Sequence, residues 1–135
     1  VVYYGDEIGM VGGNDPDNRR MMRFNNLKKE EQEVKKTTAN LLNFRQKALP
    51  LIFGDFKVLH VEHNQLVYQR TYFDEVVIVA LNDSKEEASI KFDDPLAKKQ
   101  TDYYTLRESA YKKEKGKIHL NIPPYSYEVI TNVKQ

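Results

Sequence analysis

Apolar and polar residues alternate with a period of two along most of the chain after residue 50. This period places every second side chain on the same face, so each alternating segment is predicted to be a half-buried β-strand. Turn-forming groups such as HN, NDS, DDP, EKG and PP separate the segments. The expected strands are residues 56–60, 65–73, 75–82, 87–92, 103–107, 117–122 and 125–133. Short strands without intervening helices predict a mainly β fold, an antiparallel β-sandwich.

The segment EVVIVALN, residues 75–82, differs from the other strands because it is apolar on both faces. Neighbouring elements must cover such a strand on both sides, so we expect it at the centre of a sheet. In contrast, KIHLNI carries Ile118, Leu120 and Ile122 on one face and polar residues on the other. This pattern is typical of a strand with one face in the core and the other in water.

Before residue 50 the apolar positions follow a helical period. One amphipathic stripe is predicted over residues 27–49, and it comprises Val34, Thr38, Leu41, Leu42, Arg45 and Ala48. Asn25 or Asn26 is expected to cap the start of this helix, and Pro50 to end it. Upstream, the apolar run of residues 1–4 predicts a short strand, which a polar loop connects to the helix.

A single strand followed by a single helix cannot bury its own apolar faces. The chain also begins inside an apolar run without an initiator Met. We therefore expect it to be cut from a longer protein, with residues 1–49 and 50–135 forming separate parts. A severed strand and helix expose apolar surface, which favours self-association through these two elements. We expect residues 1–26 to be poorly packed or to pair with another copy of the chain.

Composition excludes several classes of protein. Of the 135 residues, 40% are hydrophobic and 30% charged, which is enough to form a folded core. Lys and Arg number 21 against 20 Asp and Glu, so electrostatics favours neither nucleic acid nor a membrane surface as partner. With no Cys and three scattered His, we predict no metal site and no cofactor.

Asp6 and Glu7 are the first candidates for paired catalytic carboxylates. Glycoside hydrolysis needs two carboxyl groups facing one bond. Adjacent residues of an extended segment point in opposite directions, so these two cannot act together on one substrate atom. We predict no catalytic residue here and expect one of the two carboxylates to make internal hydrogen bonds at the end of the strand instead.

The loop GGNDPDNRR, residues 12–20, gathers glycines, carboxylates and guanidinium groups. Gly12 and Gly13 allow backbone conformations that other residues avoid. The carboxylates and guanidinium groups can bind sugar hydroxyls, or they can pair with one another and brace the loop. Both interpretations stay open at this stage.

At these residues the sequence resembles a known family. VVYYGDEIGMVGGNDPDNRR resembles the last barrel strand and following loop of α-amylase-type glycoside hydrolases, family 13, and within them the neopullulanase and cyclomaltodextrinase-like branch. LLNFRQKALPLIFGDFKVL resembles the eighth barrel helix of that family and its exit. VVIVALNDSKEEASIKF and IPPYSYEVI are similar to its antiparallel C-terminal domain. Met21 and Met22 depart from the pattern, since relatives usually have Pro after the Arg pair.

The resemblance implies the last βα unit of a truncated (β/α)8 barrel followed by a β-sandwich C-terminal domain. The family's three catalytic carboxylates lie on earlier barrel strands, so the chain carries none of them. Asp15 and Arg19 match the Asp and Arg that hydrogen-bond glucose units in many relatives. The implied partners are an α-glucan oligosaccharide and the missing barrel of the parent, a retaining enzyme. Its compartment stays open between a secreted, periplasmic or cell-surface location and the cytoplasm.

A second interpretation is an autonomous carbohydrate-binding β-sandwich module. Such modules present exposed aromatic side chains to sugar rings. The chain has nine Tyr, six Phe and no Trp. The candidate positions for such an aromatic surface are Tyr103, Tyr104, Tyr111 and Tyr125.

Overall fold

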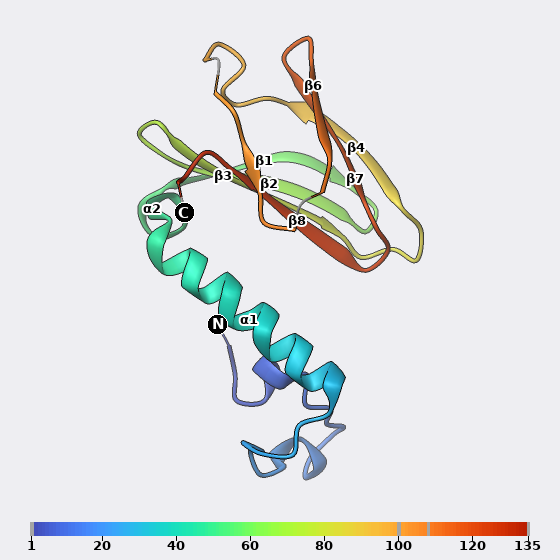
Figure 1. Cartoon of the computed structure of the whole chain (residues 1–135). Helices are drawn as coiled ribbons and strands as arrows, with labels where there is room; N and C mark the ends of the chain where they lie inside the picture. Colours follow the sequence, from blue (N-terminus) through green and yellow to red (C-terminus); the bar gives the residue numbers. More distant parts are fainter. Residues whose placement is uncertain (1, 100, 108, 135) are drawn as a thin grey trace. The chain divides into compact units, whose positions relative to one another are not determined.

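The computed structural model describes residues 2–99, 101–107 and 109–134 (Figure 1). The chain divides into two compact units, Val1–Gln46 and Lys47–Gln135. The first unit contains two short 3-10 helices, Asp6–Ile8 and Asp17–Arg19, and nearly all of α1, Lys29–Lys47. The second unit begins with α2, Leu49–Phe53. Its strands are β1 (Asp55–Glu62), β2 (Gln65–Tyr72), β3 (Glu75–Asn82), β4 (Ala88–Asp93), β5 (Tyr104–Thr105), β6 (Tyr111–Glu114), β7 (Lys117–Ile122) and β8 (Ser126–Thr131).

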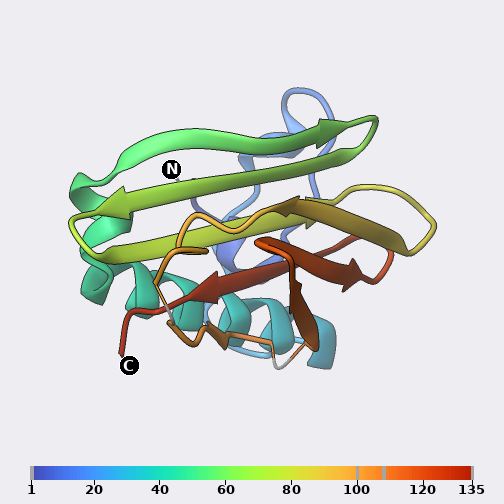
Figure 2. The same ribbon diagram turned by 90° about the horizontal axis from the view of Figure 1, so that it is seen from above.

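The strands form two antiparallel sheets. One sheet has the order β1-β2-β3-β8-β5 and the other the order β4-β7-β6. Figure 2 shows the long strands β1, β2 and β3 running side by side. The predicted antiparallel β fold is confirmed, and so is the central position of β3, which pairs with β2 on one side and β8 on the other.

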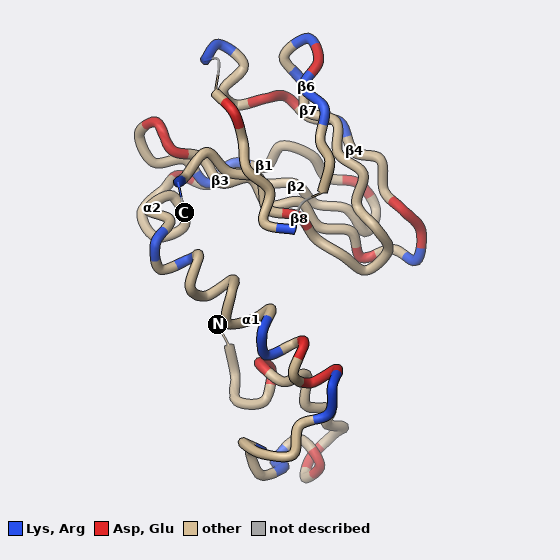
Figure 3. The backbone as a smooth tube through the Cα atoms, viewed as in Figure 1, with Lys and Arg blue, Asp and Glu red and all other residues tan. Residues whose placement is uncertain are grey.

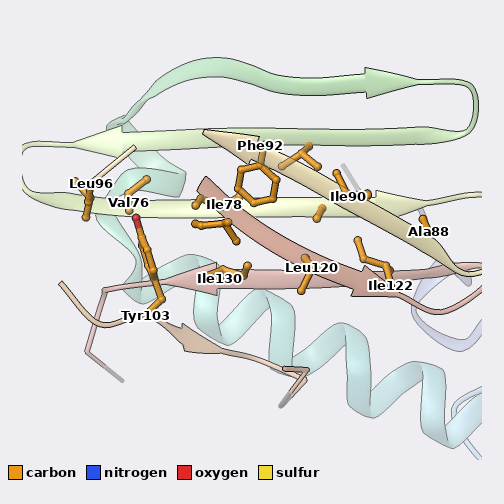
Figure 4. Packing of buried hydrophobic residues seen from close by; sticks show 13 residues of the cluster. Val76, Ile78, Ala88, Ile90, Phe92, Leu96, Tyr103, Leu120, Ile122 and Ile130 are labelled. Carbon is orange, nitrogen blue, oxygen red and sulfur yellow. The ribbon is translucent and has the colours of Figure 1, made fainter. Parts of the chain in front are cut away.

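The core of the second unit lies between the two sheets (Figure 4). Alternate side chains of β3, among them Val76, Ile78 and Ala80, are fully buried there. From the other sheet, β4 and β7 contribute Ile90, Phe92, Ile118, Leu120 and Ile122. Burying one such side chain stabilises the fold by about 1.5–3 kcal/mol. The alternation seen in the sequence therefore corresponds to the packing of two sheets.

Asn82 joins the two sheets at the end of β3. Its side-chain amide donates hydrogen bonds to the carbonyl oxygens of Glu86, Ile122 and Pro123, at 2.8, 3.2 and 3.0 Å. Its side-chain oxygen accepts hydrogen bonds from the amide and hydroxyl groups of Ser84. Asn82 is only 2% exposed, so these bonds replace the water that the side chain loses on folding.

A second buried polar cluster holds the segment between β4 and β5. The Tyr103 hydroxyl donates a 2.6 Å hydrogen bond to Asp94 Oδ1, and Lys113 Nζ lies 3.0 Å from Asp94 Oδ2. The backbone amide of Leu96 also donates to Asp94. Burial raises the pKa of Tyr103 far above its ordinary value of 10.0, and the hydrogen bond and negative charge of Asp94 act in the same direction.

The junction between α2 and β1 is tightly packed. Arg70 of β2 donates two hydrogen bonds to the carbonyl oxygen of Gly54, at 3.0 and 2.7 Å. A Cβ atom at Gly54 would lie 2.4 Å from the carbonyl oxygen of Pro50 and 2.7 Å from that of Thr71. Only glycine fits at this position, and the reason is space, because φ is −71° there.

The predicted helix forms as α1, but it begins two residues later and ends two residues earlier than the predicted residues 27–49. The backbone is extended at Ala48, and Pro50 lies in the first turn of α2, where proline is tolerated because its missing N–H has no helical partner. At the start of α1, Glu31 accepts a hydrogen bond from the backbone amide of Lys28 at 2.8 Å. This contact, and not a cap by Asn25 or Asn26, satisfies a free backbone donor before the helix.

The strand predicted at residues 1–4 is also not formed in its described part. Val2 and Tyr3 have no regular structure and Tyr4 lies in a turn, whereas Val1 lies outside the described residues. A strand needs a neighbour to pair with, and the backbone here instead closes a local turn from Asp6 N–H to the Tyr3 carbonyl at 3.0 Å.

Strand β1 forms one edge of the five-stranded sheet. Among the described residues it pairs with β2 alone, and the register shifts between Val58 and His60, which marks a β-bulge or a similar irregularity. Phe56, Val58 and Val61 are exposed on this strand. Charged residues stand at both of its ends, Asp55 and Glu62.

Candidate functional site

The first unit begins with a turn held by its own carboxylates. Asp6 accepts a 2.8 Å hydrogen bond from the amide of Tyr3, and Glu7 accepts one of 2.9 Å from the amide of Gly5. Gly5 and Gly9 flank this turn with φ of 93° and 61°. Both carboxylates thus accept hydrogen bonds from nearby backbone amides, whereas the sequence predicted this for only one of them.

Asp17 organises the following loop. It accepts a 2.8 Å hydrogen bond from the amide of Gly13, and Arg20 donates to both of its carboxylate oxygens at 2.7 and 2.8 Å. The hydrogen bond from Gly13 lowers the pKa of Asp17 below its ordinary value of 3.8, and Arg20 adds to this effect. Hydrogen bonds and an ion pair within the loop therefore stabilise it, which is one of the two interpretations that the sequence left open.

Asp15 and Arg19, the predicted sugar-binding residues, lie together in the same loop. Arg19 Nε is 2.8 Å from Asp15 Oδ1, and a second guanidinium nitrogen donates to Asp15 Oδ2 at 3.1 Å. The side chain of Arg19 is 75% exposed and that of Asp15 is 58% exposed. An exposed pair of this kind contributes little to stability. It presents a planar set of donors and a set of acceptors to the solvent, an arrangement that suits neighbouring sugar hydroxyls.

Sequence reasoning placed these residues in one loop but missed how they pair. Asp15 pairs with Arg19 at a spacing of four, and Asp17 with Arg20 at a spacing of three. These spacings bring side chains together on one turn of helix, and the short 3-10 helix Asp17–Arg19 contains one partner of each pair. Helical spacing of opposite charges was the available signal.

Two of the four tyrosines expected to present an aromatic surface have structural roles instead. Tyr103 is buried, and the Tyr111 hydroxyl exchanges hydrogen bonds with the backbone of Tyr103 at 3.2 and 3.1 Å. Tyr104 and Tyr125 are exposed. The structure therefore excludes a sugar-binding surface that consists of all four tyrosines.

The described residues form no group of three His, Asp or Glu side chains that could hold a metal ion. None of the described helices has the length and apolar character to cross a membrane. Basic and acidic residues are interspersed along the second unit (Figure 3), in line with the net charge of +1. The polar loop of residues 12–20 is thus the candidate site in the first unit.

The two packed antiparallel sheets of the second unit form a β-sandwich domain. Residues 54–130 match the family model described as the alpha-amylase C-terminal domain. The chain belongs to the alpha-amylase C-terminal domain family.

Named relatives extend this similarity beyond the β domain. The chain is 34% identical to a cyclomaltodextrinase of Geobacillus thermopakistaniensis (strain MAS1) over 129 residues, 93% of the chain and 21% of that protein. It is 28% identical to neopullulanase 2 of Thermoactinomyces vulgaris over 134 residues, 98% of the chain and 23% of that protein. The chain therefore spans between a fifth and a quarter of the length of these relatives.

The structure is similar to that of an α-amylase from Geobacillus thermoleovorans, solved in complex with acarbose. The TM-score is 0.78 at 29% identity, and the match covers 96% of this chain and 28% of the amylase chain. The similarity thus includes most of the first unit as well as the β domain. The predicted resemblance to α-amylase-type enzymes is confirmed.

Proposed function

We propose that this chain is the non-catalytic C-terminal part of an enzyme that hydrolyses α-glucans. The observation that carries the proposal is the similarity to the acarbose-bound amylase over 96% of the chain. The cyclomaltodextrinase and neopullulanase relatives support the same class of substrate. In this proposal the β domain stabilises the enzyme and the loop of residues 12–20 contacts sugar.

In the described part of the chain, the carboxylates of Asp6, Glu7 and Asp17 do not form the pair that the reaction requires. A retaining glycosidase needs two carboxyl groups about 5–5.5 Å apart on either side of the bond. Asp6 and Glu7 are occupied by backbone amides, and Asp17 is occupied by Gly13 and Arg20. We therefore expect no hydrolysis of a chromogenic maltoside or of maltooligosaccharides by the purified chain. Turnover above that of a buffer blank would overturn the proposal.

Asp15 and Arg19 have the groups that a sugar subsite requires. The carboxylate accepts hydrogen bonds from hydroxyl groups, and the guanidinium fork donates two parallel ones. The ion pair between Asp15 and Arg19 is exposed and therefore contributes little to stability. Sugar hydroxyls can replace it at small cost for this reason. The separate network of Asp17 and Arg20 keeps the loop in place when this exchange occurs.

Nuclear magnetic resonance titration with maltoheptaose tests this subsite. We expect the amides of residues 14, 15 and 17–19 to shift at millimolar sugar, and the Arg19→Lys variant, which lacks the fork, to bind at least about fivefold more weakly. Arg23→Lys is the matched control, since Arg23 pairs with Glu31 outside this loop. Absence of any loop shift, or equal loss in both variants, would contradict the assignment.

A further inference from the structure

Aromatic side chains gather where α2 meets the turn between β2 and β3. Phe53 is 66% exposed and Phe73 is 84% exposed, with the half-buried Tyr72 between them. The ring centroids of Phe53 and Tyr72 are 5.9 Å apart, and those of Tyr72 and Phe73 are 4.7 Å apart. We refer to Phe53, Tyr72 and Phe73 as the aromatic ledge.

Phe73 occupies this place in an unfavourable backbone conformation. Its φ is 51°, in the left-handed region. Asparagine adopts this region readily, as Asn26 and Asn64 do here, but for a bulky side chain it is an outlier. The strongly exposed ring of Phe73 gains little from burial that would offset this strain. A strained residue whose side chain adds little to folding is a candidate for a functional role.

The side chain of Asn132 fixes the turn that carries Phe73. The side-chain amide of Asn132 donates to the carbonyl oxygen of Asp74 at 2.8 Å, and its oxygen accepts from the amide of Val76 at 2.7 Å. Asp74 also forms an exposed ion pair with Lys99. The turn that carries Phe73 is therefore held in position, and the ion pair of Asp74 and Lys99 lies at this turn.

We propose that the aromatic ledge binds the pyranose rings of an α-glucan chain. The apolar faces of sugar rings stack on Phe73 and Phe53, while Asp74 accepts and Lys99 donates hydrogen bonds to the hydroxyl groups. The ledge belongs to the second unit, whereas Asp15 and Arg19 belong to the first. The choice of an α-glucan rests on the proposed function, whereas the stacking of pyranose rings rests on the ledge itself.

The variant Phe73→Gly separates binding from folding. Glycine adopts a positive φ without strain, so removal of the ring should leave the thermal midpoint unchanged or raise it. If the ledge binds glucan, the dissociation constant for maltoheptaose at the amides of residues 72–75 should rise about fivefold or more.

Tyr125→Gly is the matched control. Tyr125 is also an exposed aromatic residue, 72% exposed with φ of 47°, and no ring of a described residue packs against it. This variant removes the same strain and a similar ring, and it should leave maltoheptaose binding unchanged. Equal weakening in both variants would overturn the assignment to the ledge.

Three further results would also overturn the proposal. A lower thermal midpoint of Phe73→Gly would show that Phe73 packs for stability. Unchanged binding by this variant would show that the ring does not contact sugar. A change in sedimentation without a change in binding would assign the ledge to contacts between copies of the chain.

Cellohexaose distinguishes failure of this site from failure of the proposed function. Binding of maltoheptaose over cellohexaose at residues 72–75 supports both. Equal binding of the two at these residues supports the ledge as a pyranose site and counts against an α-glucan function. Sugar-dependent shifts confined to residues 14–19 would reject the ledge and leave the proposed function standing.

Discussion

Buried polar side chains of the β domain bind backbone groups. Asn82 ties β3 to the end of β7, and Glu128, only 1% exposed, accepts hydrogen bonds from the amides of Arg107, Ser109 and Val129. A buried polar group that loses its partner costs about 1–3 kcal/mol, so such residues fix the ends of strands more strictly than surface charges do. These side chains determine how the loops leave the two sheets.

Tyr103 gives this domain a specific response to alkaline pH. Its pKa is raised in the folded state above the unfolded value of 10.0, so its contribution is complete below pH 10 and is lost as the pH rises. Above pH 10 the free energy of unfolding should fall by about 1.4 kcal/mol per pH unit from this one group. Urea denaturation at several pH values measures the slope.

The Tyr103→Phe variant is the control for that slope. Its free energy of unfolding should be about 1 kcal/mol lower at neutral pH, because the hydrogen bond to Asp94 is absent. The variant should also lack the additional fall of this free energy with pH above pH 10. If the free energies of unfolding of wild type and variant fall in parallel above pH 10, the slope does not come from Tyr103.

Single residues of the candidate site were predictable only in part. The sequence located Asp15 and Arg19 because they stand in one short polar loop. It did not predict the positive φ of Phe73, since a backbone conformation of this kind leaves no trace in hydrophobic periodicity. Nor did it reveal Asn82, whose partners Ile122 and Pro123 lie 40 and 41 residues away along the chain.

Strands were predicted best where they pair on both sides or cover the core. The expected bounds of residues 75–82 and 117–122 agree with those of β3 and β7. Strand β6 was missed, because only its first residue, Tyr111, is apolar and the lysine-rich segment after it shows no alternation. The helix was expected to end at Pro50, but proline fits the first turn of a new helix as well as it ends an old one.

The junction of α2 and β1 should be sensitive to a single methyl group. We expect Gly54→Ala to lower the free energy of unfolding by about 3 kcal/mol, because the new Cβ meets the backbone of Pro50 and Thr71. Thermal unfolding followed by circular dichroism measures the change.

Gly13→Ala is the comparison for that variant. A Cβ at Gly13 would lie 3.5 Å from Asp17 Oδ2, an ordinary contact, so the change should stay within about 0.5 kcal/mol. Equal effects of the two substitutions would show that backbone entropy, and not the close approach at Gly54, determines the result.

Across the whole chain, stability is concentrated in the β domain. The core residues of β3 are fully buried and the strand is paired on both sides, whereas Val2, Tyr3 and Tyr4 are exposed and outside regular structure. The amides of residues 77–80 should therefore exchange with solvent only by global unfolding. Those of Val2 and Tyr4 should exchange at rates close to those of an unfolded peptide.

Hydrogen exchange followed by mass spectrometry measures this contrast. The exchange of residues 77–80 should slow or accelerate together with global stability, for example in the Gly54→Ala variant, while that of Val2 and Tyr4 should not change. Strong protection of Val2 and Tyr4 in a sample shown to be monomeric would contradict the prediction and point to a paired strand at the start of the chain.

The irregular edge strand β1 also affects the tendency of this domain to aggregate at high protein concentration. A straight strand with free N–H and C=O groups is a template on which a neighbouring molecule can continue the sheet and begin a fibril. The register shift between Val58 and His60 interrupts that template midway, and Asp55 and Glu62 place negative charge at both ends of it. A sheet that ends in this way can keep apolar side chains on its edge at high protein concentration without recruiting other molecules into an aggregate.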